Sequence, residues 1–97
     1  MENSINLKLK NLIDKAAAIL QSYGALEIYA FGSATGKNFG ENSDIDLAVR
    51  GMPPKNFFSA VGDALCSLDR NIDIVDLDAG TAFGKYLEDH GELTRVL

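Results

Sequence analysis

One short motif constrains this chain more than any other: Gly32-Ser33, followed after ten residues by Asp44-Ile45-Asp46. The glycine and serine predict a turn after an apolar strand, and the two aspartates open the next strand. Residues i and i+2 of a strand point to the same face of a sheet, so Asp44 and Asp46 are expected to converge. Convergent carboxylates repel each other, so a fold that keeps them together usually supplies a cation. A turn that can accommodate a phosphate, beside a cation site, indicates binding of a nucleotide with its metal.

A third apolar segment, residues 72–77, contributes another carboxylate. Its bulky Ile72 and Ile74 are expected to face the helices, so Asp73 should point toward the face of Asp44 and Asp46. Asp76 and Asp78 lie at strand positions of the opposite parity to Asp73, so they are not expected to join Asp44 and Asp46. Three carboxylates on two strands can hold two divalent ions, which stabilise the attacking and leaving oxygens of a phosphoryl displacement. Mg²⁺ (or Mn²⁺) is the expected ion because it prefers oxygen ligands, waters and phosphates.

The rest of the chain predicts alternating helices and strands. Apolar residues at helical spacing, turn residues and alternating strands give this order: helix 4–23, strand 26–31, loop 32–43, strand 44–50, helix 54–70, strand 72–77, helix 81–91 and tail 92–97. We therefore expect an α/β (α+β) fold with a small mixed β-sheet and helices packed on one face. The other face should hold the aspartates and stay open to solvent or a partner.

Length and composition limit the class of protein. At 97 residues the chain is expected to be one domain, residues 1–97, with a modest core. Its net charge of −5 argues against direct binding of a nucleic-acid backbone. The longest apolar run is too short for a membrane span and no signal peptide is recognised, so a cytoplasmic location is expected. Cys66, Phe83 and Tyr86 are interpreted as core residues, the last two in preference to a base-stacking platform.

The spacing of these motifs resembles the nucleotidyltransferase superfamily with the DNA polymerase β-like fold. The resemblance includes Phe31-Gly32-Ser33, the segment 42–49 around the aspartate pair, and the acidic strand 72–77. It runs from about Leu26 to the C-terminus, with residues 1–24 as the leading helix. Because the chain is short, it is most similar to the minimal nucleotidyltransferases, which consist of the catalytic core alone.

The resemblance implies a function and a role for each site residue. Asp44 and Asp46 would bridge the metals, and Asp73 would contact the ion at the acceptor hydroxyl and help to deprotonate it. Gly32, Ser33 and Lys37 would meet the phosphates of a nucleoside triphosphate, most plausibly ATP. The reaction would transfer AMP to a hydroxyl and release pyrophosphate. Relatives are commonly found with a small HEPN-domain protein, in pairs that look like toxin–antitoxin modules.

One departure from the family pattern keeps a second hypothesis open. Many relatives have an arginine soon after the Gly-Ser, whereas here Lys37 is the only cation of the loop. Lysine is a point charge and lacks the bidentate fork of arginine. The alternative is therefore an antitoxin or regulatory subunit that acts by contact, with or without bound nucleotide. Transfer to a small molecule is a third, weaker possibility, and an oligomer is possible.

Overall fold

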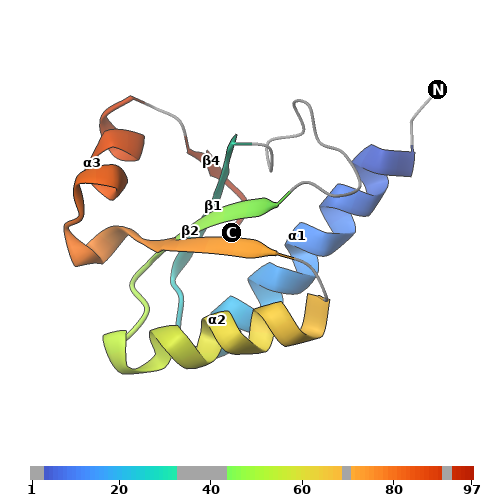
Figure 1. The fold of residues 1–97 in the computed structure, drawn as a ribbon, viewed down its shortest axis with the longest axis horizontal. Coiled ribbons are helices and arrows are strands. Elements are labelled where there is room, and N and C mark those ends of the chain that lie inside the picture. Colours follow the sequence, from blue (N-terminus) through green and yellow to red (C-terminus); the bar gives the residue numbers. More distant parts are fainter. Residues whose placement is uncertain (1–3, 33–43, 69–70, 91–92) are drawn as a thin grey trace.

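The computed structural model describes residues 4–32, 44–68, 71–90 and 93–97, with side chains from residue 8 onward. Its elements follow the expected order, and Figure 1 shows their arrangement. They are α1 (Ser4–Ser22), β1 (Glu27–Phe31), β2 (Ile45–Arg50), α2 (Pro54–Leu68), β3 (Ile72–Asp76), the 3-10 turn η2 (Leu77–Ala79), α3 (Ala82–Asp89) and β4 (Thr94–Arg95). The helices and strands of the described segments end within about two residues of the predicted bounds.

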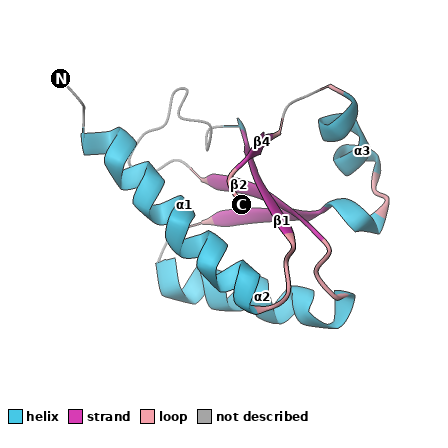
Figure 2. Ribbon diagram, turned by 180° about the vertical axis from the view of Figure 1, so that it is seen from behind, coloured by secondary structure: helices cyan, strands magenta, loops and turns pink. Residues whose placement is uncertain are grey.

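The four strands form one mixed sheet in the order β3-β2-β1-β4. β1 runs antiparallel to β2 and to β4, whereas β2 and β3 are parallel. Parallel neighbours need a crossover connection, and α2 supplies it between β2 and β3 (Figure 2). As a result, β2 and β3 begin at the same edge of the sheet, and β1 ends there.

The main core lies between one face of the sheet and the helices α1 and α2. On β2, Ile45, Leu47 and Val49 are completely buried on this face, as the alternation predicted. The other buried members of this cluster include Leu9, Ile13, Ala16, Leu20, Ile28, Ala30, Ala60, Ala64, Leu68 and Ile72. The expected fold class, a small mixed sheet with packed helices, is confirmed.

The opposite face of the sheet is only partly open. Phe31 and Ala48 pack there against Leu77 and Leu87, and so form a second, smaller apolar cluster. Leu87 belongs to α3, whose N-terminus is capped by Thr81 through a hydrogen bond that the Gly84 amide donates to Oγ1. The expectation that this whole face would be open is therefore wrong at the α3 end, and it applies only to the end that holds the aspartates.

Two further expectations need correction. The segment after residue 92, expected as a tail, contains β4, and the Val96 amide donates to the Ile28 carbonyl over 2.8 Å. Two exposed strand residues, Thr94 and Arg95, leave no alternating pattern for a sequence analysis to detect. Cys66 is exposed because it lies on the side of α2 opposite the buried Ala60 and Ala64.

No helix within the described part of the chain has both the length and the apolar character needed to cross a bilayer.

Candidate active site

The candidate site lies at the edge of the sheet where β2 and β3 begin. Asp46 and Asp73 are register partners on these parallel strands. Asp46 is half-buried, Asp73 is exposed, and Asp44 is exposed immediately before β2. The neighbours of Asp46 and Asp73 in sequence, Ile45 and Ile72, are buried on the helix side. Alternation therefore directs both carboxylates to the other face, as the sequence parity predicted.

Gly32 lies so close to the Asp46 carboxylate that a larger residue at this position would have to displace it. It follows Phe31, the cross-strand partner of Asp46. Gly32 has a φ of +59°, and a Cβ built there would lie 2.6 Å from Asp46 Oδ2. The left-handed backbone therefore favours glycine, and glycine also leaves the Asp46 carboxylate in place. The other two predicted nucleotide-binding residues, Ser33 and Lys37, lie outside the described residues.

The donor set of this site fits Mg²⁺, which prefers carboxylate oxygens, waters and phosphates. Among the described residues, no three His, Cys, Asp or Glu side chains are already gathered as metal ligands. However, neighbouring strands lie about 4.8 Å apart, so side-chain rotation can bring the register partners Asp46 and Asp73 onto one ion. Asp44 precedes Asp46 by two residues, at the same edge of the sheet.

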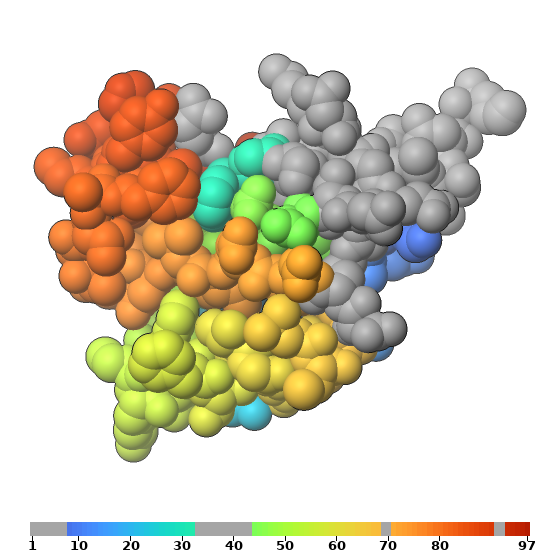
Figure 3. All heavy atoms as spheres, viewed as in Figure 1, coloured from blue at the N-terminus to red at the C-terminus, as the bar shows by residue number. Residues whose placement is uncertain are grey.

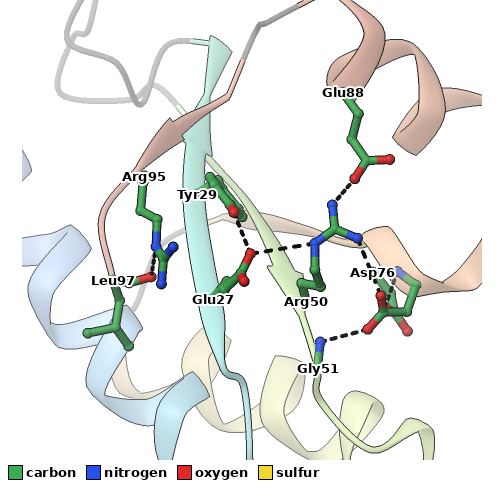
Figure 4. Close-up of polar contacts among 9 residues, drawn as sticks. Glu27, Tyr29, Arg50, Gly51, Asp76, Glu88, Arg95 and Leu97 are labelled. Atoms are coloured by element: carbon green, nitrogen blue, oxygen red, sulfur yellow. Dashed lines mark hydrogen bonds and ion pairs between the residues drawn. The ribbon is translucent and has the colours of Figure 1, made fainter.

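The other acidic residues of this region have structural roles at the far end of β2. The Asp78 amide donates to Asp76 Oδ1 over 3.0 Å, which caps the η2 turn. Asp78 Oδ2 accepts a hydrogen bond of 2.6 Å from the Gly51 amide. Figure 4 shows these contacts grouped around Arg50. Asp76 and Asp78 are thus kept apart from the candidate site by their position at the far end of the strands.

Arg50 connects α3 to the sheet through ion pairs with Glu27, Asp78 and Glu88. The Tyr29 hydroxyl donates a hydrogen bond to Glu27 Oε1, and this bond raises the pKa of Tyr29 above its usual value. The four charged groups are about one-third to one-half exposed, so each pair stabilises the fold only modestly. Together with Leu87, they fix the position of α3 on the sheet.

The interpretation of Phe83 and Tyr86 as core residues is wrong. Their exposed fractions are 51% and 49%, because the short helix α3 packs through Gly84 and Leu87. The ring of Phe83 meets Phe31 edge-on, with 5.8 Å between centroids. Tyr86 stacks on His90 at 4.1 Å. Apolar residues at helical spacing marked these positions, but the spacing alone did not show which of them face the sheet.

Comparison with solved structures supports the fold. A chain of a toxin–antitoxin crystal structure with AMP-PNP aligns with a TM-score of 0.64 and 24% identity, covering 88% of this chain and 69% of its own length. A protein proposed to be a minimal nucleotidyltransferase aligns with a TM-score of 0.66 and 20% identity, covering 92% of this chain and 94% of its own. A chain from the structure of the tri-AMPylated Shewanella oneidensis HEPN toxin in complex with MNT antitoxin aligns with a TM-score of 0.62 and 20% identity. The alignment covers 90% of this chain and 70% of that one.

Comparison at the sequence level gives the family. A search of curated proteins found no significant match. The family described as Polymerase beta, Nucleotidyltransferase, however, matches residues 14–93, which take in the end of α1 from residue 14 onward, all of α2, the strands β1 to β3 and α3. The matched region also contains the Gly32 turn and all three aspartates of the candidate site. The chain therefore belongs to the polymerase β-like nucleotidyltransferase family.

Proposed function

We propose that this chain transfers a nucleoside monophosphate, AMP from Mg-ATP, to a hydroxyl group on a partner protein. The observation that carries the proposal is the register of Asp46 with Asp73, at the sheet edge where Gly32 also lies against Asp46. A turn without a side chain lets phosphate approach the backbone closely. Carboxylates on two adjacent strands beside such a turn match the requirements of phosphoryl transfer.

Each residue has a distinct role in the proposed reaction. Asp44 and Asp46 would hold the Mg²⁺ that accompanies the triphosphate, and Gly32 leaves room for the phosphates. Asp73 orients the acceptor hydroxyl and takes its proton as the oxygen attacks the α-phosphorus. The new O–P bond forms while the bond between the α- and β-phosphates breaks, and pyrophosphate leaves. When bound, Mg²⁺ would neutralise phosphate charge and lower the pKa of the acceptor hydroxyl.

We propose a HEPN-domain protein as the acceptor. Two of the similar folds belong to toxin–antitoxin complexes, and one of these complexes contains a tri-AMPylated HEPN toxin. The open sheet edge around Asp44 and Asp73, both exposed, leaves room for a protein hydroxyl to approach. In this proposal residues 1–97 form one domain, and the acceptor hydroxyl belongs to the other protein.

Coexpression with a HEPN protein encoded next to this chain tests the proposal against the contact-only alternative. If the HEPN protein alone arrests the growth of the host cells, coexpression of the wild-type chain should restore growth. The double variant Asp44→Asn, Asp46→Asn should fail to restore growth although it is folded and expressed. The contact-only alternative is favoured by the absence of arginine after Gly32-Ser33. Full rescue by the double variant would support that alternative and exclude an essential transfer reaction.

A further inference from the structure

The proposed reaction leaves one feature of this face unused, the exposed aromatic ring of Phe83. It is half-exposed although it forms an edge-to-face pair with Phe31, with 5.8 Å between the ring centroids. Phe31 is the cross-strand partner of Asp46 and directly precedes Gly32. Figure 3 shows α3 beside the exposed end of β1 on this side of the molecule. Phe83 is therefore separated from the candidate phosphate site by a single side chain.

We propose that Phe83 is the stacking surface for the base of the bound nucleotide. This inference rests on the proposed function, because it needs triphosphate at Gly32 and Asp46. A nucleotide bound there must place its base within one ribose of the phosphates, and the first exposed ring that the described residues offer on the α3 side is Phe83. Every base has a π-face, and stacking on an aromatic side chain is tolerant of base identity.

The surroundings of Phe83 favour this role over its neighbour Tyr86. The Tyr86 ring already stacks on His90 at 4.1 Å with 29° between the planes, so one of its faces is covered. The rings of Phe83 and Phe31 meet at 66° in an edge-to-face pair, which positions Phe83 while about half of it stays exposed. Leu87 and the ion pair between Arg50 and Glu88 hold α3 in place behind the ring. The base would thus meet a surface that is preorganised.

A new fluorophore at position 83 tests the stacking directly, because the chain contains no Trp. The variant Phe83→Trp keeps an aromatic ring and provides a single indole. Mg-ATP should quench its fluorescence, whereas Mg-tripolyphosphate, which has no base, should leave the fluorescence unchanged. Tyr86→Trp is the matched control on the same helix, and its fluorescence should not respond to either compound.

Affinity measurements separate this inference from the proposed function. By calorimetry, Phe83→Ala should weaken Mg-ATP binding about five- to hundredfold, which is the effect of losing one aromatic–base stack. Its affinity for Mg-tripolyphosphate should match that of the wild type. If Phe83→Ala loosens α3, the fluorescence response of Phe83→Trp to Mg-ATP decides whether the base stacks at position 83. ATP binding of wild-type strength by Phe83→Trp, with no response of its indole, overturns the stacking role and leaves the proposed function standing. If the wild type binds neither compound, both proposals fail.

Discussion

Asp46 on β2 and Asp73 on β3 are register partners across a parallel strand pair, and both point away from the helices α1 and α2. The relationship follows from topology. The α2 crossover makes β2 and β3 parallel, so both strands begin at one edge, and β1 brings Gly32 to that edge from the opposite direction. A change in register of one residue would turn either carboxylate into the core.

Metal binding should depend on Asp44 and Asp46. At a free Mg²⁺ concentration ten times the Kd, binding should stabilise the wild type by about 1.4 kcal/mol. This corresponds to a rise in Tm of roughly 6–11 °C for a domain of this size. Asp44→Asn with Asp46→Asn should abolish this shift, since it removes both charges that attract the ion. The control is Asp14→Asn with Asp89→Asn, which removes the same charge from two surface ion pairs. Thermal melts with and without Mg²⁺ give the answer, and an undiminished shift in the first variant contradicts the site.

Asp73 should affect the transfer step more than nucleotide binding. Replacing it by Asn removes the proposed proton acceptor, so kcat should fall about 10²- to 10⁴-fold, while ATP affinity changes little. Asp76→Asn is the matched control on the same strand. An amide oxygen at position 76 can still accept the hydrogen bond from the Asp78 amide, so activity should be retained. A larger loss at position 76 than at position 73 would reverse the assignment of strand faces.

Gly32→Ala should damage both the fold and the site. The left-handed φ of +59° costs a residue with a Cβ about 1–2 kcal/mol, and the new methyl group would displace the Asp46 carboxylate. Gly62→Ala is the control, because that glycine lies within α2 and its Cβ would meet nothing within 4 Å. It should stabilise the chain by about 0.5–1 kcal/mol. Urea denaturation and Mg-ATP binding measure both effects, and wild-type binding by Gly32→Ala would contradict the close approach.

The free energy of unfolding should depend on alkaline pH through two tyrosines. Hydrogen bonds to Asp63 and Glu27 raise the pKa values of Tyr23 and Tyr29, respectively, above the usual value of 10.0. The unfolded chain therefore loses these protons first, so the stabilisation is complete below pH 10 and is lost as pH rises through the folded-state values. Urea midpoints should fall more steeply above this pH in the wild type than in Tyr23→Phe with Tyr29→Phe. Equal slopes would show that these hydrogen bonds do not couple to stability.

Strand parity predicted the sheet face of two candidate site residues because it depends only on local geometry. The alternation around Asp46 and Asp73 placed both on the correct face, and the bulky Ile72 fixed the direction of β3. The position of α3 could not be predicted in the same way. It depends on long-range contacts, the packing of Leu87 on the sheet and the ion pairs of Arg50. For the same reason the sequence did not show that Phe83 would be exposed beside Phe31.

The most direct test of the central claim is nucleotide transfer with ATP labelled at different phosphates. The wild-type chain, Mg²⁺ and a HEPN protein encoded next to it are incubated with ATP labelled at either the α- or the γ-phosphate. The α-label should become covalently attached to the HEPN protein and the γ-label should not, and Asp44→Asn with Asp46→Asn should abolish the labelling. Transfer of the γ-label, or α-labelling that survives in the double variant, would contradict the central claim.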